Sequence, residues 1–188
     1  MLIIESYKVE YKEQIQDICR ATCWEHFKKN QKLQECMNLM YVDYYMDFEP
    51  HNVLVAKDSE SGNIAGYIVF STNPKLYKEK NLKVIFPEIL KRCFYLAIFH
   101  LICVNQSLKY DKIYGGGFHI NISPDYQKQG AGKLLMDAAA KKLKDQNIQY
   151  MYLITASRKT TGYKFYTHIG FKEVHRYFNG TIALAKPN

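Results

Sequence analysis

A pair of glycines at the start of a predicted helix carries the clearest chemical signal in the sequence. The segment reads Gln127, Lys128, Gln129, Gly130, Ala131, Gly132 and Lys133, and it follows a predicted strand. Glycine lets the backbone approach a ligand closely because it has no Cβ. The first N–H groups of a helix are free and favour negative charge. With Lys128 and Lys133 beside them, these groups predict a site for a phosphate-containing ligand.

Two nucleotide-binding motifs do not fit this segment. A dinucleotide fingerprint would need a third glycine where Leu135 stands. A phosphate-binding P-loop would need glycine at position 127 and serine or threonine at position 134, where the chain has Gln127 and Leu134. The pattern that remains is Q-x-x-G-x-G, which alone is equally compatible with a helix start that happens to contain glycine.

The strand before the loop supplies a titratable side chain. Apolar Phe118, Ile120 and Ile122 alternate with polar His119, Asn121 and Ser123. Because side chains alternate along a strand, His119 and Asn121 are predicted on one face unless a bulge changes the parity. The ordinary pKa of histidine, about 6.5, makes His119 the candidate general base, with a structural histidine and a water relay as the alternatives.

The elements that must position these residues follow from periodicity and turn signals. The predicted strands are 2–7, 53–57, 64–71, 112–123, 149–156, 171–177 and 181–185, and the predicted helices are 15–23, 33–46, 87–106, 131–143 and 160–168. Hairpins at both ends and a strand–helix–strand unit in the middle predict one α/β (or α+β) domain over residues 1–188. The segment 73–111 is a long insert before the central strand.

Two motifs in order resemble a known family. Q-x-x-G-x-G is similar to the acetyl-CoA pyrophosphate loop of the GNAT acyltransferase superfamily, and Phe165-Tyr166-x-x-x-Gly170-Phe171 resembles its closing motif. The second motif follows the first at the expected distance, one helix and one strand later. The resemblance covers about residues 53–174; the first fifty residues match only in the order of elements. Lys159 and Gly162 depart from the Asn and Ala that members often carry there.

The resemblance implies a fold and an activity. The fold is a mixed, mostly antiparallel twisted sheet flanked by helices, with a central strand–loop–helix cofactor site and an extra helix inserted between the third and fourth strands. The activity is N-acetyltransfer from acetyl-CoA (coenzyme A) to a primary amine of a small molecule or peptide. A non-catalytic acyl-CoA-binding module is the alternative.

The resemblance also assigns residues. Residues 127–133 would hold the pyrophosphate, and the backbone of Ile120, Asn121 and Ile122 would contact the pantetheine arm, which inserts where the strands splay after Ile122. Tyr166 matches the tyrosine that donates a proton to the leaving thiolate. Trp24, Glu25 and His26 are candidates to line the acceptor pocket, where Glu25 could hold a cationic amine.

Charge and cysteine content bound the partners. Lys plus Arg exceed Asp plus Glu by 26 − 18 = 8, which favours anionic ligands. The basic residues are spread along the chain and match no nucleic-acid motif, so no nucleic-acid partner is expected. Five cysteines without metal-ligand spacing predict reduced thiols, no metal site and a cytoplasmic protein.

An apolar run at 93–104 lies within the insert. It is too short to cross a bilayer, which needs about 20 apolar residues, so no membrane partner is expected. Large exposed apolar patches are rare on monomers. The predicted helix 87–106 is therefore expected either to cover the acceptor pocket or to form a homodimer contact.

Overall fold

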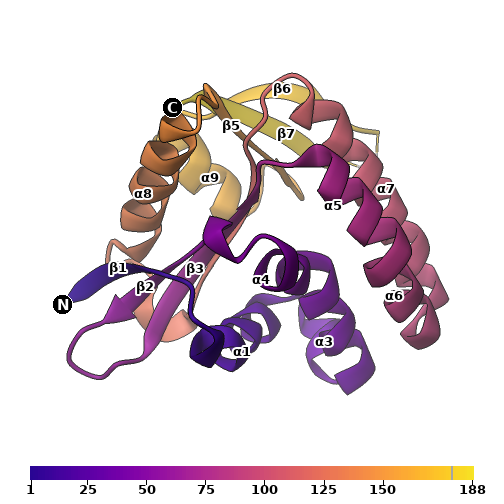
Figure 1. The fold of residues 1–188 in the computed structure, drawn as a ribbon, viewed down its shortest axis with the longest axis horizontal. Helices are drawn as coiled ribbons and strands as arrows, with labels where there is room; N and C mark the ends of the chain where they lie inside the picture. Colours follow the sequence, from indigo (N-terminus) through magenta and orange to yellow (C-terminus); the bar gives the residue numbers. More distant parts are fainter. Residues whose placement is uncertain (179) are drawn as a thin grey trace.

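One seven-stranded sheet organises the computed structural model, which describes residues 1–178 and 180–188 (Figure 1). The strands are β1 (Leu2–Ser6), β2 (Val53–Asp58), β3 (Ile64–Ser71), β4 (Gly117–Ile122), β5 (Tyr150–Thr155), β6 (Lys172–Arg176) and β7 (Ile182–Pro187). Their order is β1-β2-β3-β4-β5-β7-β6. Only β4 and β5 pair in parallel among the described strands; the other neighbours are antiparallel. The mixed, mostly antiparallel sheet predicted from the sequence is confirmed.

Helices cover both faces of the sheet. One face carries α8 (Ala131–Asp145) and α9 (Thr161–His168); the other carries α1 (Lys12–Thr22), α3 (Gln31–Asn38), α4 (Tyr44–Phe48) and the helices of the insert, while α2 (Glu25–Lys28) follows α1. The alternation along β3 decides which side chain enters which layer. Tyr67 and Val69 pack with the N-terminal helices, whereas Ile68 and Phe70 pack with α8.

The N-terminal helical region is longer than predicted. A π-helical turn, Leu39–Asp43, joins α3 to α4. The side chain of Asn30 caps α3 by accepting a hydrogen bond from the N–H of Leu33. The predicted helix 33–46 is therefore part of an almost continuous helical stretch over residues 31–48.

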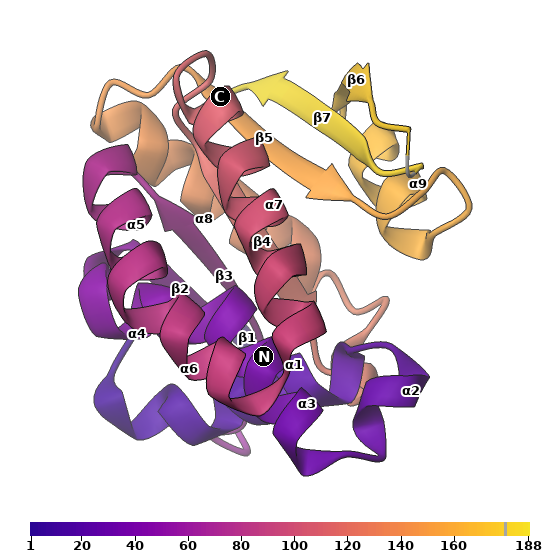
Figure 2. The same ribbon diagram turned by 90° about the vertical axis from the view of Figure 1, so that its right-hand side faces the viewer.

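The insert contains more helix than predicted. It runs through α5 (Pro74–Lys80), a π-helical turn (Asn81–Ile85), α6 (Phe86–Arg92) and α7 (Phe94–Asp111). The predicted single helix 87–106 is wrong in its bounds because Cys93 has an extended backbone, φ −157° and ψ 105°, and separates α6 from α7. An apolar run continues across this break and so does not reveal it. Figure 2 shows α7 lying across the central strands.

The central strand begins later than predicted. Residues 112–116 form a connection, and β4 starts at Gly117. Glycine is required here by close approach: a Cβ on Gly116 would lie 2.4 Å from the carbonyl oxygen of Tyr150, and a Cβ on Gly117 would lie 2.5 Å from the hydroxyl of Tyr152. The parallel pairing is restricted to Gly117 and Tyr152. The strands therefore separate from Gly117 onward, not after Ile122 as predicted.

Candidate active site

The separation of β4 from β5 opens a cavity of about 330 Å³. His119, Ile120 and Asn121 line it from β4, residues 153–156 line it from β5 and its following loop, and Tyr166 lines it from α9. A parallel pair that stays together would leave no such space. The central strand, its polar side chains and the motif tyrosine therefore surround one cavity.

The loop after β4 ends in a helix terminus with free donors. Gly130 has φ +87°, a left-handed conformation that favours glycine, and it stands at the N-terminus of α8 without a side-chain cap. The first N–H groups of α8 have no partner within the helix and, with the helix dipole, favour an anion. Lys128 also has a positive φ, 64°. A plain helix start does not require two residues with positive φ, and this geometry is compatible with a pyrophosphate site.

Polar side chains around the loop bind the loop itself. The Nε2 atom of Gln127 donates to the carbonyl of Ile122 at 3.4 Å, and the Nε2 atom of Gln129 donates to the carbonyl of Asp125 at 2.8 Å. Lys133 pairs with Asp137 at 2.7 Å. The two glutamines therefore stabilise the loop, and the backbone N–H groups at the start of α8 are the donors available to an anion.

Gly132 has a different role from Gly130. A Cβ added to Gly132 would lie 3.3 Å from the Phe165 ring, so this glycine lets α8 pack closely on α9. A Cβ on Gly130 would meet nothing within 4 Å, and there the constraint is φ alone. The sequence predicted that both glycines make room for the ligand. In the structure, Gly132 allows close helix packing, whereas Gly130 allows the left-handed backbone conformation.

Tyr166 lies buried on α9 beside the cavity. Its ring packs edge-on against Phe118 at 6.0 Å and Phe171 at 5.8 Å between centroids. The hydroxyl of Thr160 caps α9 by accepting a hydrogen bond from the N–H of Tyr163 at 3.2 Å. Burial raises the pKa of the Tyr166 phenol, so the hydroxyl stays protonated and remains a donor.

His119 points into the cavity from the face of β4 that the N-terminal helices cover. The pairing of residues 117–122 with β3 has no bulge, so His119 shares its face with Asn121, as predicted. Its ring stacks on Tyr41 with centroids 4.8 Å apart. The Nδ2 atom of Asn121 lies 3.1 Å from Nε2 of His119 and donates to the hydroxyl of Tyr67 at 3.0 Å. Burial lowers the pKa of His119 to about 4, so the imidazole is neutral at pH 7.

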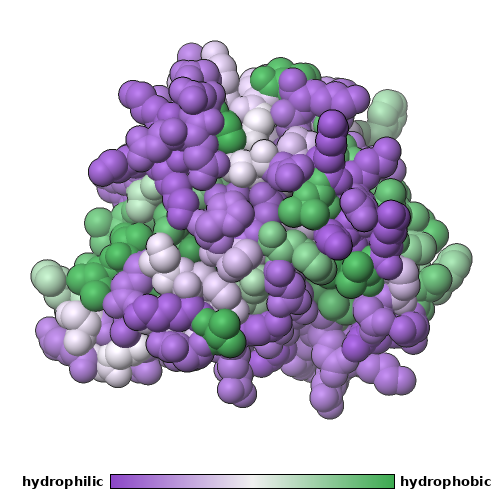
Figure 3. All heavy atoms as spheres, viewed as in Figure 1, coloured by the Kyte–Doolittle hydropathy of each residue, from purple (hydrophilic) through white to green (hydrophobic). Residues whose placement is uncertain are grey.

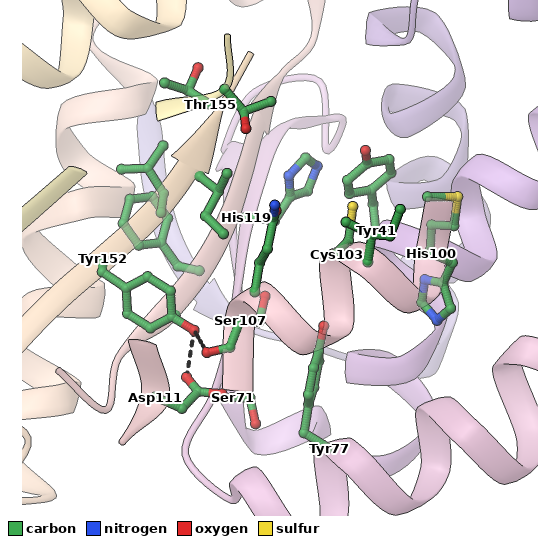
Figure 4. Close-up of a pocket in the computed structure, with 18 of the residues that line it drawn as sticks. Tyr41, Ser71, Tyr77, His100, Cys103, Ser107, Asp111, His119, Tyr152 and Thr155 are labelled. Atoms are coloured by element: carbon green, nitrogen blue, oxygen red, sulfur yellow. Dashed lines mark hydrogen bonds between the residues drawn. The ribbon is translucent and has the colours of Figure 1, made fainter. Parts of the chain in front are cut away.

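A second cavity, of about 190 Å³, is also lined by His119 (Figure 4). Both cavities are lined by Trp24, Tyr41, Phe118, His119 and residues 153–156, so they adjoin along a shared wall that includes the histidine. The second cavity is walled by α7 through Phe99, His100, Cys103 and Asp111 and by tyrosines of the neighbouring elements. The insert therefore covers this pocket.

A comparison with known protein families identifies the family of this chain. Residues 15–171 match the family described as the acetyltransferase (GNAT) family. The chain belongs to the GNAT family. It is therefore an acetyltransferase with coenzyme A as its cofactor. A search of curated proteins by sequence finds no significant match.

Solved structures share this GNAT fold at low sequence identity. SsHAT is 18% identical, with a TM-score of 0.85 over 99% of this chain and 98% of that one. The PaiA N-acetyltransferase of Thermoplasma acidophilum, solved with coenzyme A, is 14% identical, with a TM-score of 0.64 over 100% and 99%. The polyamine N-acetyltransferase of Drosophila melanogaster is 12% identical, with a TM-score of 0.62 over 100% of both chains.

The lining of the two cavities differs from the sequence-based expectation at Glu25 and His26. Trp24 lines both cavities, but Glu25 is exposed and pairs with Lys28 at 2.6 Å. Neither Glu25 nor His26 is among the residues that line the cavities, so the expectation that Glu25 faces the acceptor is wrong. A short helix at the surface turns these side chains outward.

Sequence reasoning missed Asp111, a carboxylate that lines the 190 Å³ cavity. It is the last residue of α7 and is 8% exposed. The only signal for it in the sequence is an acidic residue at the end of an apolar helix, and such residues are usually solvated. Its burial depends on the position of α7 across β4 and β5.

The sequence also predicts no metal site and no membrane partner. In the part of the chain that the structure describes, no group of three potential ligand side chains is placed to hold a metal ion. No described helix is at once long and apolar enough to traverse a bilayer.

Proposed function

We propose that this enzyme transfers the acetyl group of acetyl-CoA to a primary amine of a small molecule or peptide that enters the cavity under α7. The observation that carries the proposal is the meeting of two cavities at His119. One cavity lies where β4 and β5 separate, and the other lies between β4 and the insert. Two reactants approaching from these sides would meet beside one histidine.

The donor would bind through backbone groups. The first turn of α8, with Gly130 and Gly132, would hold the pyrophosphate, and the free edge of β4 over Ile120–Ile122 would bind the pantetheine arm between β4 and β5. The side chains of Ile120 and Ile122 belong to the α8-side core, which fixes the edge of this strand. The arm would fill the space left by the missing β4–β5 ladder.

The transfer step then follows from the groups present. The amine nitrogen attacks the thioester carbon, a C–N bond forms and the C–S bond breaks. The sulfur leaves as a thiolate and takes a proton, which the buried Tyr166 hydroxyl can donate. The proton lost by the amine goes to His119 directly or to water beside it, since His119 is neutral and faces both cavities.

The low pKa of His119 gives a pH prediction. Because the imidazole is neutral above about pH 4, wild-type turnover of a monoamine should show no inflection from this residue near pH 6.5. His119→Ala should lower kcat several-fold without creating or removing an inflection between pH 5.5 and 7.5. Stopped-time assays over this range would check it. An inflection near pH 6.5 that disappears in His119→Ala would contradict the assignment.

A panel of amines with acetyl-CoA, read as free thiol released, tests the proposed function. Turnover with at least one amine, lost when Tyr166 is replaced, is the expected result. The alternative, a non-catalytic acyl-CoA-binding module, would bind CoA by calorimetry and release no thiol with any amine.

The outer face of α7 supports a proposal about assembly. Phe94 and Tyr95 are each 70% exposed and Ile98 is 42% exposed, and Figure 3 shows hydrophobic residues along the edge where α6 and α7 lie. We propose that a second copy of the chain covers this face, because isolated monomers rarely expose such patches. Phe94→Glu should convert a dimer to a monomer in light scattering, whereas Lys141→Glu on α8 should not. A wild-type protein that is monomeric at high concentration would contradict the proposal.

A further inference from the structure

The acceptor cavity contains a buried carboxylate that no cation neutralises. Asp111 is 8% exposed, and the described residues place no lysine, arginine or histidine in an ion pair with it. The Tyr152 hydroxyl lies 2.6 Å from Oδ1 of Asp111 and 2.9 Å from the carbonyl oxygen of Ser107 (Figure 4). Buried charges are normally paired, so an unpaired carboxylate facing a cavity points to a cationic ligand.

The neighbouring buried carboxylate shows what a structural role looks like. Glu49 is 2% exposed and accepts hydrogen bonds from the Tyr44 hydroxyl at 2.7 Å, the Asn52 side chain at 3.2 Å and the Thr72 N–H at 3.1 Å. Its oxygens are satisfied by the protein, and it does not line the cavity. Among the described residues, Asp111 has one hydrogen-bond donor, and it does line the cavity.

A second buried polar group in the same cavity lacks a partner. Nε2 of His100 is buried without a hydrogen bond, and the residue is 2% exposed. Burial lowers the pKa of His100 to about 4, which leaves a neutral imidazole. The rings of Tyr41, Tyr45, Tyr77 and Tyr152 also line this cavity. Neutral imidazole nitrogens and aromatic faces both interact favourably with ammonium groups.

The position of Asp111 sets the length of the ligand. Its carboxylate lies beside the Tyr152 hydroxyl, which is directly above Gly117. His119 is two residues further along β4, or roughly 7 Å at the rise of an extended strand. An amine that reacts beside His119 and reaches Asp111 must therefore carry its second group at the other end of a short chain, as 1,4-diaminobutane does.

We propose that the acceptor is a linear amine with a second ammonium group, which Asp111 binds inside the cavity while the first amine reacts beside His119. This inference rests on the transfer reaction proposed above and specifies its acceptor class. Asp111 acts here as a binding residue for the substrate and takes no part in moving the acetyl group.

The same geometry makes binding pH-dependent. Burial raises the pKa of Asp111 to about 6. The titratable groups around it are Glu49 and the hydroxyls of Tyr45, Tyr77 and Tyr152, with His100 elsewhere in the cavity. The tyrosines stay protonated and His100 stays neutral near pH 6. Falling pH should protonate Asp111 and weaken binding of the second ammonium.

The experiment compares 1,4-diaminobutane with pentylamine, in which a methyl group replaces the second amine. Binding to the protein in the presence of CoA is measured by calorimetry, and turnover with acetyl-CoA is measured as thiol release. Wild type should prefer the diamine at least tenfold at pH 7.5. Asp111→Asn keeps an acceptor for Tyr152 and should reduce this ratio to about one without changing pentylamine. The control is Glu25→Gln, which removes an exposed charge outside the cavity and should keep the preference.

The outcomes separate the proposed role of Asp111 from the proposed transfer reaction. Equal binding of both amines to wild type, or an unchanged preference in folded Asp111→Asn, overturns the inference. If Asp111→Asn does not fold, the pH dependence of wild-type binding tests the role of Asp111. The affinity for the diamine should fall from pH 7.5 to pH 5, while the affinity for pentylamine should not change; equal pH dependence of both would overturn the inference. Asp111-dependent diamine binding without any thiol release would keep this inference and refute the transfer reaction. Thiol release that is equal for both amines would do the reverse.

Discussion

Replacing Tyr166 with phenylalanine is expected to lower kcat about 100-fold, the lower end of the range for general acid–base catalysis, and to leave the KM for acetyl-CoA nearly unchanged. The hydroxyl lines the cavity between β4 and β5, and burial keeps it protonated. Its proton is needed only as the thiolate leaves, so its loss affects the transition state more than the bound substrate. Steady-state kinetics with saturating amine would measure both constants.

The matched control is Tyr163→Phe on the same helix. The Tyr163 hydroxyl donates to Glu173, and the residue does not line the cavities. The control should therefore leave kcat unchanged. Thermal unfolding of Tyr166→Phe should match wild type, since no protein group pairs with this hydroxyl among the hydrogen bonds of the described residues. An unaltered kcat, with chemistry demonstrated to limit the rate, would contradict the role of Tyr166.

Replacing Gly130 with valine is expected to weaken CoA binding at least tenfold, or about 1.4 kcal/mol. Gly130 has φ +87°, and a left-handed conformation costs other residues roughly 1–2 kcal/mol, more for a β-branched one. The substituted loop should therefore leave this conformation and turn the first N–H groups of α8 away from the pyrophosphate. Calorimetric titration with CoA would measure the loss.

Gly62→Val is a matched control, because Gly62 also has a positive φ but lies far from the α8 terminus in the sequence. Gly62 has φ +76° in the β2–β3 turn, and a Cβ there also meets nothing within 4 Å. Both variants should lose similar stability in thermal unfolding, but only Gly130→Val should lose affinity for CoA. Equal CoA affinity in folded Gly130→Val and wild type would rule out the α8 terminus as the pyrophosphate site.

Local sequence determined the parts of this protein that depend on near neighbours. The alternation around His119 places it with Asn121 on one face of β4, because a strand repeats every two residues. The glycine at position 130 marks the left-handed start of α8 because φ is a property of one residue. The two motifs in order were sufficient for the family, since each stands in the element that its chemistry requires.

Tertiary structure alone decided where the proposed acceptor cavity lies. The break at Cys93, the separation of β4 and β5 from Gly117 onward and the outward turn of Glu25 each differ from the sequence-based expectation. The burial of Asp111 depends on the contact of α7 with Tyr152, 41 residues away. Periodicity reports which residues share a face of one element, but which faces meet is set by packing between distant segments. A carboxylate that looks solvated in the sequence can therefore become a buried charge in the acceptor cavity.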